Sequence, residues 1–120
     1  MKRLLIILLT TLVASLVLAS PPETVAVTYR FTPEGEKALL RAIRDHWAVT
    51  RRLGLVGPEH DLYRGDGFFL EIFTWKDASI PDDPPAEVRK IWDELERRVD
   101  RSKGKAALEV EEIHPVGLSN

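Results

Sequence analysis

A carboxylate inside an apolar segment is the side chain of this sequence best suited to proton transfer. In the segment FFLEIFTW, residues 68–75, alternate residues share a side, so Glu71 lies with Phe73 and Trp75. Desolvation drives such a carboxylate toward its protonated form unless a cation pairs with it. Glu71 is therefore either a general base or the structural partner of a cation, for which Arg30 is the obvious candidate.

His46 and Trp75 are the other two candidate catalytic residues. His46 precedes Trp47 in a segment of helical periodicity, and neighbouring helix positions differ by about 100°, so His46 lies near the edge of the buried face. It could act as a base there, or simply be a solvated or capping residue. Trp75 ends its strand and could wall a pocket between sheet and helices, the alternative being plain packing.

Aromatic residues on several predicted elements could bind an aromatic substrate. Their rings supply apolar walls, and tyrosine adds a hydroxyl group. The predicted substrate-binding residues are Tyr29, Trp47, Phe73 and Trp92.

The sequence lacks the motifs of several enzyme classes. It has no nucleophile elbow, phosphate loop or dinucleotide fingerprint, so hydrolase, kinase and dehydrogenase chemistry has no support. His46, His60 and His114 are scattered, no two histidines are four residues apart, and there is no cysteine. This is a poor metal signature, and we expect neither a metal site nor a cofactor.

The residues just described lie on elements whose order predicts the fold. Period-two alternation indicates strands, and apolar residues at helical spacing indicate helices. The order strand, helix, strand, strand, helix, strand predicts an α+β ferredoxin-like fold with a four-stranded antiparallel sheet. The predicted elements are a strand at 24–31, a helix from Thr32-Pro33-Glu34 to about Leu53, a hairpin of strands 59–64 and 68–75 around Gly65-Asp66-Gly67, a loop at 78–85, a helix over 86–99 capped by Asp82 or Asp83, a turn at 102–105 and a strand at 107–116.

Two helices can cover only one face of that sheet, yet strand 68–75 is apolar on both sides. Burying each large apolar side chain is worth about 1.5–3 kcal/mol, so leaving two phenylalanines and a tryptophan in water would be costly. We therefore expect a homodimer that closes a dimeric α+β barrel, the alternative being cover by loop 78–85. The two sides carry Phe68, Leu70 and Ile72, and Phe69, Phe73 and Trp75.

The first residues have the layout of a secretory signal. Lys2 and Arg3 precede an apolar run from Leu4 to Leu18, which is short for a membrane-spanning helix. We expect cleavage after Ala19, an uncleaved anchor being the alternative, and hence an exported protein without stable membrane insertion. The expected organisation is a signal peptide at 1–19, a linker at 20–23, one domain at 24–116 and a tail at 117–120.

The charge of the exported chain argues against nucleic acid as a partner. The whole chain has 17 cations and 19 anions. Removing Lys2 and Arg3 leaves 15 cations against 19 anions, a net charge near −4. An acidic chain gives no support to nucleic-acid or anionic-membrane binding.

With its element order, glycine hairpin and segment Glu71-Ile72-Phe73-Thr74-Trp75-Lys76-Asp77, the chain resembles the antibiotic biosynthesis monooxygenase family of dimeric α+β barrels. The resemblance spans about residues 23–116. It implies a homodimer with a pocket in each subunit, where some members oxidise quinols or polyketide phenols with dioxygen and no bound cofactor. Haem-degrading members rely on an asparagine in the first strand and a histidine on the second helix, and this chain has neither, so that branch resembles it less.

Two functions follow from this resemblance. One is an exported, cofactor-independent monooxygenase acting on a quinol or another small aromatic molecule, with Glu71 or His46 as base. The other is a non-catalytic dimeric module that binds a small ligand or another protein.

Overall fold

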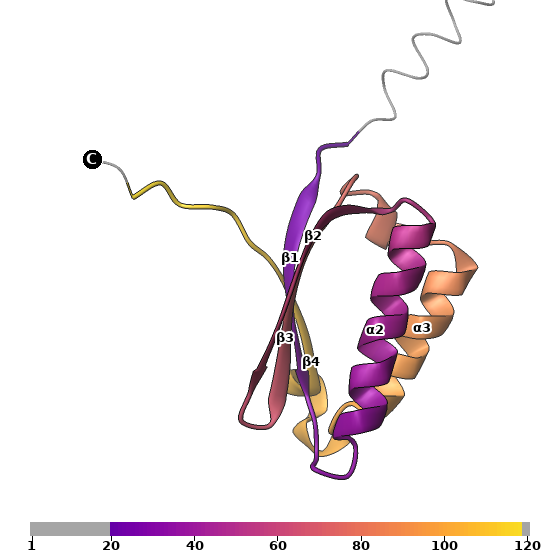
Figure 1. Cartoon of the computed structure of the whole chain (residues 1–120), viewed down its shortest axis with the longest axis vertical. Coiled ribbons are helices and arrows are strands. Elements are labelled where there is room, and N and C mark those ends of the chain that lie inside the picture. Colours follow the sequence, from indigo (N-terminus) through magenta and orange to yellow (C-terminus); the bar gives the residue numbers. More distant parts are fainter. Residues whose placement is uncertain (1–19, 119–120) are drawn as a thin grey trace, which may run out of the picture.

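The computed structural model describes residues 20–118, which form a sheet with two helices packed against it (Figure 1). The strands form in segments of alternating burial, and the helices in segments with one apolar stripe. The elements are β1 (Glu23–Arg30), α2 (Glu36–Arg52), β2 (Val56–Gly65), β3 (Phe68–Trp75), the 3₁₀ helix η1 (Ile80–Asp82), α3 (Ala86–Arg98), the 3₁₀ helix η2 (Arg101–Ala107) and β4 (Leu108–Glu112).

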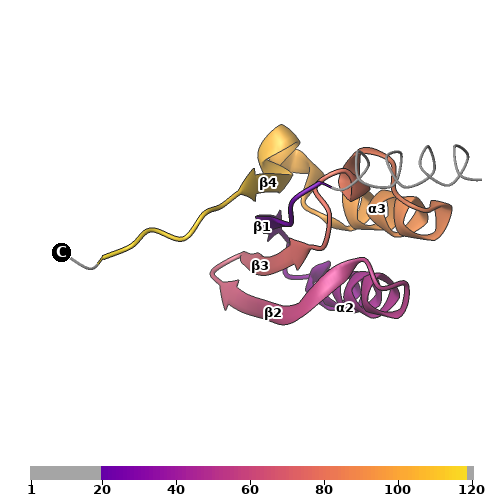
Figure 2. The same ribbon diagram turned by 90° about the horizontal axis from the view of Figure 1, so that it is seen from above.

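The four strands form one antiparallel sheet in the order β2-β3-β1-β4. Helices α2 and α3 lie side by side on the same face, as Figure 2 shows from above. The predicted α+β ferredoxin-like fold is thereby confirmed. The described chain leaves the opposite face of the sheet without a helix (Figures 1 and 2).

The core lies between the sheet and the two helices. Along β3, and along β1 from Thr24 onward, buried and half-buried residues alternate, because successive side chains point to opposite faces. The helices add Leu39, Ile43 and Leu95 to the buried cluster. The inner face of these two strands carries Val25, Val27, Tyr29, Phe69, Glu71, Phe73 and Trp75.

The prediction that a second subunit must cover two phenylalanines and a tryptophan of β3 is wrong for these three residues. Phe69, Phe73 and Trp75 are each 3% exposed, and the chain's own helices cover them. The unpaired face carries the other set, Phe68, Leu70 and Ile72, all half-buried. Loop 78–85 does not provide the cover, because its Ile80 packs against the core on the helix side.

Two helix starts differ from the predicted ones. Residues 33–35 form a turn in which Thr32 Oγ1 accepts a hydrogen bond from the Gly35 backbone N–H, and α2 begins only at Glu36. Its end is as predicted, since Gly54 follows with a positive φ of 71°. The predicted aspartate caps of α3 are wrong, because Pro85 occupies the N-cap position.

The outer strands also differ in extent. β2 starts at Val56, earlier than predicted, and an irregularity between Val56 and His60 interrupts its register with β3. The predicted turn at 102–105 is part of η2. β4 ends at Glu112, after which the chain runs away from the sheet (Figures 1 and 2), with Val116 and Leu118 exposed.

The predicted signal peptide, residues 1–19, lies outside the described residues, as do the last two residues of the predicted tail. Within residues 20–118, no helix is long and apolar enough to cross a membrane.

Candidate active site

An apolar cavity lies between the inner face of the sheet and the helices, on the side of β1, β4 and α3. Its volume is about 320 Å³, a size suited to a small organic molecule. The part of its wall formed by β4 is open to solvent, because Val110 is 59% exposed. The lining residues are Val25, Val27, Tyr29, His46, Phe73, Trp75, Pro81, Trp92, Leu95, Glu96, Leu108 and Val110.

Aromatic rings form the inner end of this cavity. The Phe73 and Trp75 ring centroids are 5.1 Å apart, and those of Trp75 and Trp92 are 6.3 Å apart, both pairs edge to face. His46 lies against the same group, 5.8 Å from Phe73 and 6.2 Å from Trp75 between ring centroids. The strand-end position of Trp75 thus contributes to a pocket wall as well as to packing.

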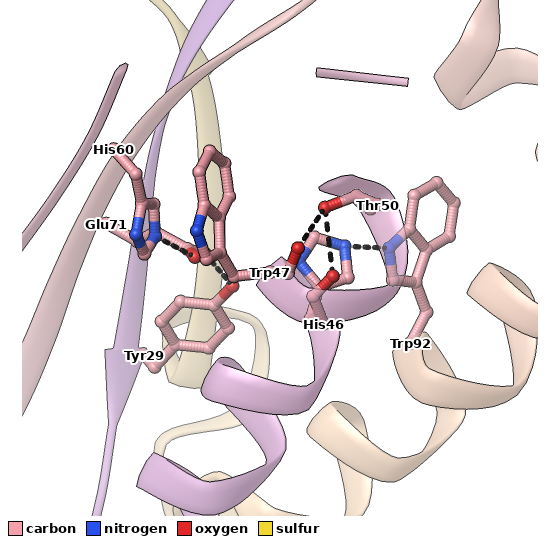
Figure 3. Close-up of polar contacts among 7 residues, drawn as sticks. All are labelled: Tyr29, His46, Trp47, Thr50, His60, Glu71 and Trp92. Carbon is pink, nitrogen blue, oxygen red and sulfur yellow. Dashed lines mark hydrogen bonds and ion pairs between the residues drawn. The ribbon is translucent and has the colours of Figure 1, made fainter. Parts of the chain in front are cut away.

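The Glu71 carboxylate is fully buried, and side chains from the two neighbouring strands hold it (Figure 3). The Tyr29 hydroxyl donates a hydrogen bond to Glu71 Oε1 over 2.7 Å. His60 Nε2 lies 2.7 Å from Glu71 Oε2. Burial, reinforced by the adjacent Glu71 carboxylate, raises the pKa of Tyr29 well above 10, so this tyrosine stays protonated.

The predicted pairing of Glu71 with Arg30 is wrong. Arg30 pairs in register with Phe68 and so points to the opposite face of the sheet. Its guanidinium group contacts Glu109 and the Ala106 carbonyl oxygen. The period-two alternation of β1 excludes an Arg30 contact with Glu71, since one strand cannot present neighbouring residues to the same face.

His46 is far more buried than its predicted edge position implied, at 3% exposure. Helix α3 packs beside α2, and Trp92 Nε1–H donates a hydrogen bond to His46 Nε2 over 3.0 Å (Figure 3). Burial lowers the pKa of His46, with Glu71 opposing and His60 adding to this effect. The neutral ring therefore carries its proton on Nδ1, which has no hydrogen-bond partner among residues 20–118.

Trp47 does not line the cavity. Its indole stacks on the His60 imidazole, with ring centroids 3.9 Å apart and planes 9° apart. The Arg51 guanidinium lies 5.7 Å from the Trp47 ring centroid. Of the seven predicted site residues, five line the cavity. The other two are Glu71, which accepts a hydrogen bond from the cavity residue Tyr29, and Trp47, which stacks on His60.

His60 was not predicted as a site residue, although the sequence contains a signal for it. The turn residues Asp66 and Gly67 connect the paired residues Gly65 and Phe68. Counting outward from that pair sets Leu62 opposite Glu71. His60 is two residues from Leu62 and so shares its face, within diagonal reach of Glu71.

Metal binding has no evident site in this part of the molecule. Residues 20–118 contain no group of three or more histidine, aspartate or glutamate side chains arranged to hold a metal ion.

The fold and cavity define a four-stranded α+β domain with an apolar pocket between sheet and helices. No protein-family model and no curated protein matches the sequence. Solved structures do match the fold, and they confirm the predicted resemblance at that level.

An antibiotic biosynthesis monooxygenase aligns with a TM-score of 0.60 and 20% identity, over 79% of this chain and 99% of that one. A Bacteroides thetaiotaomicron protein described as a possible oxidoreductase aligns at 0.63 with 12% identity, covering 79% and 98%. A Mycobacterium tuberculosis protein aligns at 0.63 with 14% identity, covering 82% and 99%.

Proposed function

We propose that this protein is an exported, cofactor-independent monooxygenase that acts on a quinol or another small aromatic molecule. The observation that carries the proposal is the cavity of about 320 Å³, walled by Phe73, Trp75 and Trp92 beside the hydroxyl-bearing Tyr29. Flat apolar walls suit an aromatic ring. Because the cavity has few polar groups, these groups would fix the position of the hydroxyl of a bound phenol or quinol. The shared fold with an antibiotic biosynthesis monooxygenase supports the same chemistry.

The reaction needs no bound oxidant beyond dioxygen. A quinol plus dioxygen gives a hydroxyquinone plus water, and the quinol itself supplies the electrons that reduce the second oxygen atom. Removing the phenolic proton makes the ring a better electron donor, so the protein must supply a base and a dry site. Glu71 and His46, the two candidate bases of the sequence, are both buried near the cavity.

Oxygen uptake with a panel of quinols tests this function. We expect uptake that requires both protein and quinol, and a loss of about 100-fold or more in the Trp75→Phe, Glu71→Gln double variant. Glu59→Gln, on the exposed part of β2, is a matched control for the charge change and keeps the wild-type rate. Equal rates in the double variant would remove Trp75 and Glu71 from the mechanism.

A non-catalytic ligand-binding module is the second candidate. The observation that favours it is that both carboxylate oxygens of Glu71 already have partners, Tyr29 and His60, as in a purely structural network. This candidate predicts that quinols or their quinone analogues raise the melting temperature without being turned over.

We also propose that the protein is a homodimer. The sheet face without helices carries Phe68, Leu70 and Ile72, half-buried in the single chain, and a second sheet would remove them from water. A monomeric mass by light scattering at micromolar concentration would contradict the dimer.

Export completes the proposal. Cleavage after Ala19 would release a chain beginning at Ser20. N-terminal sequencing of the protein from a fractionated bacterial host tests it, and a cytoplasmic chain that retains Met1 would contradict it.

A further inference from the structure

A diagonal line of three polar residues crosses the inner face of the sheet. The register pairs Tyr29 with Phe69 and Leu62 with Glu71. Tyr29 and Glu71 are therefore diagonal neighbours, and so are Glu71 and His60, which is the spacing that long side chains can bridge. Both steps are made by contacts of 2.7 Å, drawn as dashed lines in Figure 3.

The two ends of this line lie in different surroundings. Tyr29 lines the cavity. The Glu71 side chain has no exposure, whereas that of His60 is 16% exposed. The contacts thus join the cavity wall to the surface near α2 through a carboxylate that water does not touch.

We propose that Glu71 accepts the proton of a phenol or quinol bound in the cavity, through the Tyr29 hydroxyl, and that His60 is the positioning residue of this carboxylate. This inference rests on the proposed function. In the step, the substrate O–H bond breaks and its proton passes to Tyr29 Oη, while the original Tyr29 proton passes to Glu71 Oε1. The products are a phenolate, a neutral Glu71 carboxyl group and an unchanged tyrosine, so the net charge is conserved.

The surroundings of the other candidate base exclude it from this role. The lone pair of His46 Nε2 already accepts the Trp92 N–H, and its Nδ1 carries the proton of the neutral ring. His46 can therefore donate a hydrogen bond but has no free basic atom. In contrast, Glu71 Oε1 directly accepts the hydrogen bond of the Tyr29 hydroxyl, so it can take up the Tyr29 proton.

Tyr29 relays a proton but is not itself the base. Its burial and its contact with Glu71 keep it protonated, as described above. The titratable groups around Glu71 are Tyr29 from β1, His60 from β2 and His46 from α2. Helix α3 contributes Glu96 to the cavity lining, with an exposed side chain.

His60 is held by its own neighbours. Trp47 stacks flat on the imidazole ring, which restricts the ring's rotation and keeps Nε2 directed at Glu71 Oε2. An ionised carboxylate can only accept, so His60 Nε2 carries a proton whenever Glu71 is charged. A second donor in this buried place stabilises the charged carboxylate that must receive the substrate proton.

The test uses para-nitrophenol as a probe, because its phenolate absorbs visible light and its phenol does not. The whole protein, after the proposed cleavage of its signal peptide, is mixed with the probe at a pH where the free probe is mainly protonated. Binding is measured by equilibrium dialysis, and the ionised fraction of the bound probe by absorbance. We expect wild-type protein to hold the bound probe largely as phenolate.

In Tyr29→Phe and Glu71→Gln, the ratio of ionised to protonated bound probe should fall by about tenfold or more, the effect of one unit in its pKa. His60→Phe keeps a ring against Trp47 but removes the donor to Glu71. It should bind the probe with unchanged affinity but ionise less of it, which a merely structural role would not produce. Tyr63→Phe makes the same chemical change on an exposed tyrosine of β2 and should match wild type. If Glu71→Gln does not fold, Tyr29→Phe still tests the relay, because this variant removes the hydroxyl and keeps the aromatic ring of residue 29.

The outcomes separate the two proposals. If the probe binds but is equally ionised in wild type, Tyr29→Phe and Glu71→Gln, or is fully protonated in all of them, the relay is wrong and the aromatic site stands. If the probe and a panel of quinols do not bind at all, the proposed function is wrong and the relay falls with it.

Discussion

At the scale of single residues, Glu71 is the most unusual position of the protein. Glu71 is the charged residue of β3, whose inner face is otherwise aromatic, and its side chain is not exposed to water. Burying a carboxylate is tolerable only when donors replace its hydration shell. Tyr29 and His60 are those donors, so the three side chains form one unit in which each depends on the others.

Replacing Glu71 by alanine should therefore destabilise the fold. The substitution leaves the Tyr29 hydroxyl and the His60 ring without their acceptor in a buried place, which costs about 2–4 kcal/mol in free energy of unfolding. Chemical denaturation measures this difference. Glu59→Ala, on an exposed part of β2, is the control and should change stability by less than about 0.5 kcal/mol. A Glu71→Ala variant as stable as that control would show that the network contributes no stability.

His46 should make the protein less stable in mild acid. Burial lowers its pKa below the usual 6.5, so as the pH falls below that value the unfolded chain takes up a proton that the folded protein does not. The free energy of unfolding therefore decreases toward low pH. Denaturation at about pH 7.5 and about pH 5.5 should show a smaller decrease in His46→Gln than in wild type.

The exposed His114 provides the comparison, because it is 75% exposed. His114→Gln should keep the wild-type pH dependence. A wild-type decrease that His46→Gln leaves unchanged would mean that another group causes it.

At the scale of elements, the β2–β3 hairpin sets the register that brings His60 to Glu71. Its turn depends on Gly67, whose φ of 79° is rarely adopted by residues with a side chain. The adjacent Gly65 lies against the Phe68 ring, where a Cβ atom would collide. The hairpin therefore needs Gly67 for its turn, whereas a side chain at Gly65 would require the Phe68 ring to shift.

Gly67→Ala should destabilise the protein by about 1–2 kcal/mol, because alanine pays for the left-handed conformation that glycine adopts freely. Thermal or chemical denaturation measures the change. Gly117→Ala, in the exposed C-terminal segment with nothing near its Cβ position, should leave stability unchanged. Equal stability of the two variants would mean that the turn adapts to a side chain at no cost.

The two helices also act as a pair at this scale. The Trp92–His46 hydrogen bond links α3 to α2, and the Arg52–Glu87 ion pair links them at the surface. Because both helices contribute to the cavity lining, their relative position determines the shape of the cavity. His46 lies on the buried stripe of α2 with Leu39 and Ile43, so its position on the helix turns it toward the sheet, and the pairing with α3 adds the Trp92 hydrogen bond.

At the scale of the whole molecule, the sheet is asymmetric. One face is covered by α2 and α3, while the other presents Leu70 and Ile72 half-buried and Tyr63 at 57% exposure. This apolar patch lies among polar residues of the same face, such as Arg30 and Glu109, and a patch of this kind is typical of an interaction surface. The proposed two-fold pairing would place these residues between two sheets.

Ile72→Lys should convert the proposed dimer to a monomer, because a lysine at the centre of the sheet face would bury an unpaired charge between the subunits. Light scattering at micromolar concentration should give half the wild-type mass. Ala48→Lys adds the same charge on the exposed side of α2 and should keep the wild-type mass. A wild-type mass for Ile72→Lys would exclude this face as the interface.

Local patterns of the sequence were sufficient for the order of elements and for the inner face of β3. Period-two alternation places Glu71 with Phe73 and Trp75, and a glycine hairpin connects β2 to β3, whatever the rest of the chain does. These features depend on backbone geometry between near neighbours. For that reason the fold class and five of the cavity-lining residues could be predicted.

Only the tertiary structure decided most partners of those residues, the exception being His60, which the hairpin register already brings near Glu71. Tyr29 and His60, not Arg30, hold Glu71, because β1 and β2 flank β3 in a register that brings these two side chains to its inner face. His46 receives its hydrogen bond from Trp92 because α3 packs beside α2. Trp47 lies on His60 instead of the cavity. Such contacts join residues from different elements, and their free energy depends on distances that no local pattern of the chain contains.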